Sequence, residues 1–217
     1  MLIDHNHPLY LKRRALSGDN KWNGAYYYSK EIVDNIIPLV KTDRNWITVN
    51  VPDHGYDHSI VFIHNNLYPE LYSWLSAHED LILVCGISET CSKVSHLGMP
   101  ICLPLSVDVG YVEQFRSEKI YETAFVGRWP KRKGITFPEG THIIENLPRV
   151  EILKLMAKFR KVYAVGRTAI EAKILGCEVL PYDPRFPDPD RWRILDNRDA
   201  AGILQKQVDE IDRRYPV

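Results

Sequence analysis

Residues 161 to 176 read Lys161-Val-Tyr-Ala-Val-Gly-Arg-Thr-Ala-Ile-Glu-Ala-Lys-Ile-Leu-Gly176. The apolar run from Lys161 to Val165 predicts a strand, and the residues from Thr168 to Leu175 predict a helix. Gly176 follows as the residue type that most easily takes the left-handed conformation after a helix end. Strands that alternate with helices in this way are typical of α/β proteins with parallel sheets.

The same alternation extends outward over most of the chain. Further strands are expected at 46–51, 59–64, 81–85, 100–105, 122–127, 143–144 and 178–181, and further helices at 29–40, 69–76, 88–97, 148–159 and 200–214. The rhythm breaks near residues 106–121, which marks a domain boundary. We therefore expect an α/β fold with two Rossmann-like parallel-sheet lobes. They would span residues 1–108 and 109–199, with 200–217 as a C-terminal helix able to pack back on the first lobe.

The composition narrows the range of functions. Lys plus Arg and Asp plus Glu each number 28 in 217 residues, so no global positive field favours a dedicated nucleic-acid binder. The first ten residues contain no apolar signal core, and no apolar run approaches the roughly 18 residues that span a bilayer. The four cysteines form no CxxC pair, which favours reduced, structural thiols. We expect a soluble, cytoplasmic protein, either a monomer or a homodimer.

Two segments of the second half combine glycine with cations directly after a predicted strand. The first ends at Gly127 and continues with Arg128, Lys131 and Lys133. The second contains Gly166, Arg167 and Thr168 at the start of a predicted helix. Open α/β sheets bind ligands at the carboxyl ends of their strands, and a diphosphate is best met by cations and the positive end of a helix. Glu171, one turn inside that helix, is placed to accept hydrogen bonds from two ribose hydroxyls.

In these residues the chain resembles the donor-binding half of GT-B glycosyltransferases, in a compact, group 1-like form such as a bacteriophage type. In that family a valine-glycine-arginine … lysine-glycine loop supplies phosphate-binding cations, which the resemblance places at Arg128 and at Lys131 or Lys133. A later family helix carries the ribose-binding glutamate, which Glu171 matches. Further matching positions are Ala172, Gly176 and Val179 in the second half and Gly98, Pro104, Val107 and Asp108 in the first.

The resemblance implies transfer of a sugar from a UDP- or GDP-sugar to an acceptor hydroxyl, with no metal or other cofactor. It also points to a glycine-containing acceptor loop, for which Gly24 and Tyr26 are the nearest candidates. The chain departs from the family by its short length. A further departure is Tyr163, at a position eight residues before the glutamate where many relatives carry an acid.

A general base for such a transfer would come from the first half of the chain. His64, at a predicted strand end, and Asp53 are the candidates, although a structural histidine is the default interpretation of His64. Asp53 also belongs to a possible metal-binding pair of Asp-His dipeptides, with His54 and His58 four residues apart. Pro52 and Gly55 make that segment a turn, which favours a loop beside the cleft over a metal site.

Other interpretations of the same residues stay open. The cations after Gly127 are also consistent with a solvated turn, and Glu171 with a surface residue that pairs with a lysine. Arg167 fits a phosphate ligand and an ion-pair partner equally well. The aromatic, basic segment 12–28 is compatible with a DNA-modifying glycosyltransferase that acts on hydroxymethylated pyrimidines in a phage-infected host cytoplasm. A third reading is a non-catalytic nucleotide- or sugar-binding module.

Overall fold

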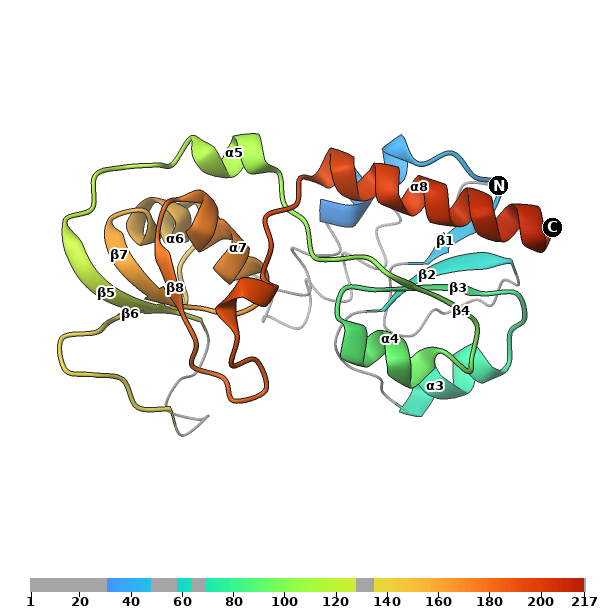
Figure 1. Ribbon diagram of the computed structural model, residues 1–217, viewed down its shortest axis with the longest axis horizontal. Coiled ribbons are helices and arrows are strands. Elements are labelled where there is room, and N and C mark those ends of the chain that lie inside the picture. Colours follow the sequence, from blue (N-terminus) through green and yellow to red (C-terminus); the bar gives the residue numbers. More distant parts are fainter. Residues whose placement is uncertain (1–30, 48–57, 64–68, 128–134, 217) are drawn as a thin grey trace. The chain divides into compact units, whose positions relative to one another are not determined.

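The computed structural model describes residues 31–47, 58–63, 69–127 and 135–216. Over these residues the chain forms two four-stranded sheets, and all the strand pairs in both sheets are parallel. Figure 1 shows the sheets with their helices. The sheets belong to two compact units: unit 1 contains the described residues up to Pro104 and those from Arg198 onward, and unit 2 contains residues 105–197. The predicted α/β class with two Rossmann-like parallel-sheet lobes is confirmed.

In unit 1 the strands follow one another across the sheet in chain order. They are β1 (Asn45–Ile47), β2 (Ser59–Ile63), β3 (Ile82–Cys85) and β4 (Met99–Cys102). Helices α3 (Pro69–Ser76) and α4 (Ser88–Val94) lie on one face, and α8 (Asn197–Arg214) lies on the other with the helical residues 31–35 (Figure 1). Every residue of β2 and β3 is buried, as expected for strands covered on both faces.

The first predicted helix ends early. Residues 31–35 are helical, and a short 3-10 helix, η2 (Ile37–Leu39), replaces the predicted continuation to residue 40. Pro38 explains the change, because proline has no N–H to donate to the preceding turn.

Helix α8 is held against unit 1 by apolar packing and by one buried arginine. Its residues Ala200, Leu204 and Val208 recur every four positions and are fully buried. Arg44, whose side chain is 1% exposed, donates from Nε to Asp212 Oδ1 of α8 at 2.7 Å. Its Nη1 donates to the carbonyl oxygen of Asp80 at 3.0 Å. Arg44 therefore connects the start of β1 both to α8 and to Asp80, two residues before β3.

Unit 2 has a strand order that reverses. Its strands are β5 (Tyr121–Val126), β6 (His142–Ile144), β7 (Phe159–Tyr163) and β8 (Glu178–Leu180), in the order β6-β5-β7-β8. From β5 the chain adds β6 on one side and then returns to add β7 on the other. The strands β5 and β7 therefore flank the switch point of the sheet.

Unit 2 carries its helices on one face of the sheet. These are α5 (Val109–Glu113), α6 (Arg149–Met156) and α7 (Arg167–Ile174), drawn on the same side in Figure 1. Ala124, Val162 and Val179 face them and form the core with Leu153 and Ile170. A short 3-10 helix, η4 (Pro189–Arg191), follows β8 in the proline-rich connection.

Several predicted boundaries in unit 2 were wrong. The strand expected at 161–165 is β7 and begins two residues earlier, because the backbone N–H groups of Ile120 and Tyr121 already donate to the Lys158 oxygen. The helix expected to reach residue 159 ends at Met156 for the same reason. The predicted break at 106–121 contains α5, whose N-cap Asp108 accepts a hydrogen bond from the Tyr111 N–H at 2.8 Å.

No helix among the described residues covers the other face of the unit 2 sheet. Part of this face is closed by an aromatic cluster of Phe125, Phe137, Tyr163 and Tyr182. The ring centroids of Phe125 and Phe137 lie 4.7 Å apart, and those of Phe137 and Tyr163 lie 5.0 Å apart. Tyr182 meets Phe125 edge-on at 5.1 Å. The aromatic cluster thus takes the place of a helix at the carboxyl ends of β5 and β7.

All four cysteines are free thiols. Cys85, Cys91 and Cys177 are buried and Cys102 is exposed, in agreement with the reduced state expected from the sequence. Within the ranges given above, no helix combines the length and apolar character needed to cross a bilayer.

Two neighbouring residues of α8 provide a test of its packing on unit 1. We expect Leu204→Ala to lower the free energy of unfolding by about 2–5 kcal/mol, because Leu204 is fully buried and its removal leaves a cavity. Ile203→Ala is the matched control, since Ile203 is 37% exposed and its loss costs about 1 kcal/mol or less. Denaturant unfolding followed by circular dichroism measures both, and equal losses in the two variants would contradict the packing.

Candidate functional site at the carboxyl edge of the second sheet

The described parts of the two predicted segments lie at the same edge of the unit 2 sheet. Strands β5 and β7 pair in parallel, with Phe125 opposite Tyr163, so the chain leaves both strands at the same edge. Gly127 directly follows β5, and residues 164–166 lead from β7 into α7. The sheet therefore brings Gly127 to the same edge as Gly166, Arg167 and Thr168. This edge also contains the switch point, where open α/β sheets bind ligands.

Gly166 is the N-cap of α7 and has a backbone conformation that favours glycine. Its φ of 64° and ψ of −138° lie in a region that residues with a Cβ atom rarely adopt. As a glycine, this N-cap residue has no side chain to accept from the first N–H groups of the helix. The positive end of the α7 dipole therefore lacks a side-chain oxygen at the position where one usually sits.

Gly127 has a packing role in addition to any role in binding. A Cβ atom at this position would lie 2.7 Å from Cζ of Phe125, which is fully buried. The close approach of the backbone to this ring therefore requires glycine.

Glu171 is buried and is held by two arginines. Its Oε1 accepts hydrogen bonds from Arg149 Nε at 3.2 Å and from Arg167 Nε at 3.1 Å, and it lies 2.9 Å from Arg149 Nη2 in an ion pair. The side chains of Glu171, Arg167 and Arg149 are 7%, 11% and 19% exposed. We refer to these three residues as the Glu171 cluster. The structure thus rules out the interpretation of Glu171 as a surface residue paired with lysine, and it shows Arg167 as an ion-pair partner.

The Glu171 cluster connects the N-termini of two helices and has a surplus of positive charge. Arg149 is the first residue of α6, and Arg167 is the first residue of α7. Two guanidinium groups face one carboxylate, which leaves a net charge of about +1. Every contact described for the carboxylate goes to Oε1, so Oε2 has no donor among the described residues. An edge with this charge favours anions, and Oε2 provides an acceptor beside them.

Sequence reasoning did not identify two residues of this edge. Arg149 belongs to the edge because it forms an ion pair with Glu171. The ring of Tyr111 lies under the Arg149 guanidinium, with 5.4 Å between Arg149 Cζ and the ring centroid. A positive charge at the first position of a helix opposes the helix dipole, so the sequence contained a feature that could have identified Arg149. It contained no such feature for Tyr111, because the position of Tyr111 depends on how α5 meets the sheet.

The other predicted site residues lie outside the described residues. They are Gly24, Tyr26, Asp53, His64, Arg128, Lys131 and Lys133. Of the two histidines in the possible metal-binding segment, His58 is described, and its Nδ1 lies 2.5 Å from Asp80 Oδ2. The described part of the chain contains no group of three or more His, Cys, Asp or Glu side chains able to hold a metal ion.

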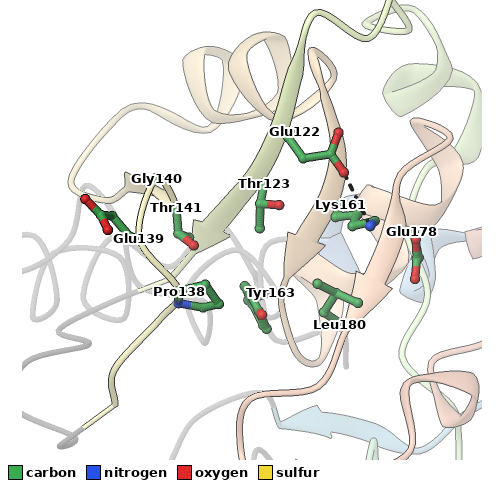
Figure 2. A pocket seen from close by; sticks show the side chains of 10 residues that line it. All are labelled: Glu122, Thr123, Pro138, Glu139, Gly140, Thr141, Lys161, Tyr163, Glu178 and Leu180. Atoms are coloured by element: carbon green, nitrogen blue, oxygen red, sulfur yellow. Dashed lines mark ion pairs between the residues drawn. The ribbon is translucent and has the colours of Figure 1, made fainter.

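A cavity of about 400 Å³ lies on the helix-free face of the unit 2 sheet. Figure 2 shows its lining, which is formed by Glu122, Thr123, Pro138, Glu139, Gly140, Thr141, Lys161, Tyr163, Glu178 and Leu180. The predicted donor-binding residues that the structure describes, Gly127, Gly166, Arg167, Thr168 and Glu171, are not among them. Tyr163, which replaces the acidic residue of many relatives, lines this cavity and also belongs to the aromatic cluster.

Removal of the charge at the centre of the Glu171 cluster should destabilise unit 2. We expect Glu171→Gln to lower the free energy of unfolding by about 2–3 kcal/mol, because two largely buried guanidinium groups lose their counter-charge. Glu151→Gln in α6 is the control, since Glu151 is 54% exposed and its pair with Lys154 contributes at most about 1 kcal/mol. Denaturant titrations compare the two, and an unchanged midpoint for Glu171→Gln would contradict the assigned contacts.

The aromatic cluster predicts a loss of stability at alkaline pH. Burial, helped by the neighbouring Asp183 carboxylate, raises the pKa of Tyr182 to about 12, although Arg185 acts in the opposite direction. An unfolded tyrosine loses its proton near pH 10, so between about pH 10 and 12 the unfolded chain is favoured as pH rises. Tyr182→Phe should remove about 1 kcal/mol of this loss at pH 11.

The measurement is the free energy of unfolding at pH 8 and at pH 11 for both proteins. Tyr215→Phe, at a residue that is 58% exposed, is the control. If Tyr182→Phe and Tyr215→Phe behave alike, Tyr182 does not account for the alkaline loss.

A scan against family models, a search of curated proteins and a search of solved structures find no match for this chain.

Proposed function

We propose that the chain is a glycosyltransferase whose second unit binds the nucleoside diphosphate of a sugar donor at the carboxyl edge of β5 and β7. One observation carries this proposal: Gly127 and the N-terminus of α7 follow neighbouring parallel strands on the two sides of the switch point. A diphosphate needs backbone and cationic donors that converge from two loops, and this arrangement supplies that convergence.

The diphosphate would lie at the N-terminus of α7. The N-terminus of α7 favours an anion there, because its N-cap residue, Gly166, has no side chain that could accept from the first N–H groups of the helix. Arg128 and either Lys131 or Lys133 supply the remaining positive charge in this proposal. Glu171 accepts a hydrogen bond from the ribose through Oε2, while Arg149 and Arg167 hold Oε1.

The reaction proposed is the transfer of the sugar to an acceptor hydroxyl. The acceptor oxygen forms a bond with the anomeric carbon, and the bond from that carbon to the diphosphate oxygen breaks. The departing diphosphate takes the electron pair, and the hydroxyl proton passes to a base, for which Asp53 and His64 of the first half are the candidates. Positioning and stabilisation of the diphosphate supply most of the rate enhancement, and no metal is needed.

In this proposal, Gly24 and Tyr26 bind the acceptor. The donor is a UDP- or GDP-sugar, and the enzyme works in the cytoplasm, which is that of the host if the chain is phage-encoded.

A binding experiment with a matched inorganic ligand tests the site. We expect UDP or GDP to raise the melting temperature, since a ligand at a hundred times its Kd stabilises by about 2.7 kcal/mol. Glu171→Gln should weaken nucleotide binding about tenfold through loss of the ribose contact, yet leave pyrophosphate binding nearly unchanged, because pyrophosphate has no ribose. Glu151→Gln should change neither affinity. Equal weakening of both ligands in Glu171→Gln would show that it acts only on the fold.

Turnover separates the enzyme from a binding module. We expect Arg128→Ala to reduce both donor affinity and sugar transfer, with Arg160→Ala as the control, since Arg160 is 63% exposed and lies in β7 away from its carboxyl end. Unchanged transfer kinetics in Arg128→Ala would exclude the assigned phosphate contact. Nucleotide binding without transfer or donor hydrolysis would instead support the non-catalytic module.

A further inference from the structure

Among the described residues, the lining of the cavity on the helix-free face of unit 2 shares no residue with the proposed diphosphate site. Its sheet residues form two rows that run across the strands. Thr123, Lys161 and Glu178 are partners in the register of β5, β7 and β8 and form a polar row. Two residues further along, Tyr163 and Leu180 are partners and form an apolar row. We refer to this site as the sheet-face cavity.

The loop before β6 and the aromatic cluster bound the sheet-face cavity. Phe137 packs on the rings of Phe125 and Tyr163, which fixes the loop at the carboxyl end of these strands. The following residues, Pro138 to Thr141, then line the cavity opposite the sheet. Figure 2 shows Thr141 and Pro138 on one side of Tyr163, with Lys161 and Leu180 on the other. The cavity thus exists because an anchored loop, rather than a helix, covers this part of the face.

We propose that the sheet-face cavity binds an uncharged saccharide. A sugar ring presents C–H groups on its faces and hydroxyl groups around its edge. The apolar row, with Pro138, provides a surface for the C–H groups, and Tyr163 contributes an aromatic side chain with a polar tip. The polar row, with Thr141, provides hydroxyl, ammonium and carboxylate groups, which together can both donate to and accept from sugar hydroxyls. The volume of about 400 Å³ falls within the usual range for small-molecule sites.

The charges of the lining distinguish this ligand from the nucleotide. Among the described residues of the lining, Glu122, Glu139 and Glu178 outnumber the one cation, Lys161, by three to one. Lys161 is also already engaged, because its Nζ lies 3.3 Å from Glu122 Oε1. A surplus of carboxylates repels phosphates and sugar acids, so neutral hydroxyl groups are the better match. The site therefore does not duplicate the proposed donor site, and it does not depend on the transferase proposal.

Saturation-transfer NMR with methyl glycosides of glucose, galactose and mannose tests the proposal on the full chain. We expect magnetisation transfer from the protein to at least one glycoside, with little to glucose 6-phosphate. We expect this signal to persist in the presence of saturating UDP and GDP. Thr123→Val removes one hydroxyl at nearly constant shape and should weaken binding about fivefold, the equivalent of one hydrogen bond. Glu178→Gln, at an exposed residue, should weaken binding to a similar extent without risk to folding.

Glu151→Gln on the opposite, helix-covered face is the control and should leave saccharide binding unchanged. Absence of transfer to every neutral glycoside would overturn the proposal, and so would a preference for the phosphorylated sugar. Binding that survives both Thr123→Val and Glu178→Gln would also overturn it. If Glu171→Gln or UDP abolishes the signal while Thr123→Val does not, the saccharide occupies the donor site instead.

Discussion

The parallel pairing of β5 with β7 is the constraint from which the rest of unit 2 follows. Because these strands run in the same direction and lie side by side, the loops that leave them reach one edge of the sheet. The reversal of strand order at this point separates the onward connections, which opens the edge between them. The N-termini of α6 and α7 reach the same edge, where the Glu171 cluster joins them. Without this pairing, neither the cluster nor the proposed phosphate site would form.

The Glu171 cluster places a carboxylate between two arginines that would otherwise be unfavourable at helix N-termini. Arginine at the first position of a helix is unfavourable, and here both α6 and α7 begin with one. Burial of Glu171 between them supplies one negative charge for two positive charges and two helix dipoles. In our proposal, the N-termini of these two helices favour an anion at this edge. The same three residues thus support the packing of two helices and attract a ligand.

The sequence predicted elements well wherever local chemistry decided them. Helix α3 was predicted at Pro69–Ser76, where proline suits the first helical position, and Gly176 does take a positive φ after α7. Boundaries set by pairing between distant residues were less accurate, as β7 shows, because the start of that strand depends on hydrogen bonds from residues 120 and 121.

The candidate site was only partly predictable, because its partners come from different elements. Glu171 was identified as important, but its engagement by Arg149 depends on the approach of α6 to α7, which no local pattern encodes. The helix-free face was equally hidden, since it depends on how Phe137 packs against the sheet. Asp53, His64 and the cations after Gly127 stay predictions, as do the transferase and its DNA-modifying and non-catalytic alternatives.

The position of α8 in the chain decides the order in which the two units can fold during translation. Unit 2 is an insertion within unit 1, because the chain enters it after Pro104 and returns at Arg198 to complete the first unit. The two connecting segments are joined by hydrogen bonds from Val107 to Leu195 and from Asn197 to Val107. Unit 2 is therefore fully translated while unit 1 still lacks the helix that buries one face of its sheet. During translation the later unit is the first to be able to fold, and the strands of the earlier one stay uncovered on one face until α8 has been translated.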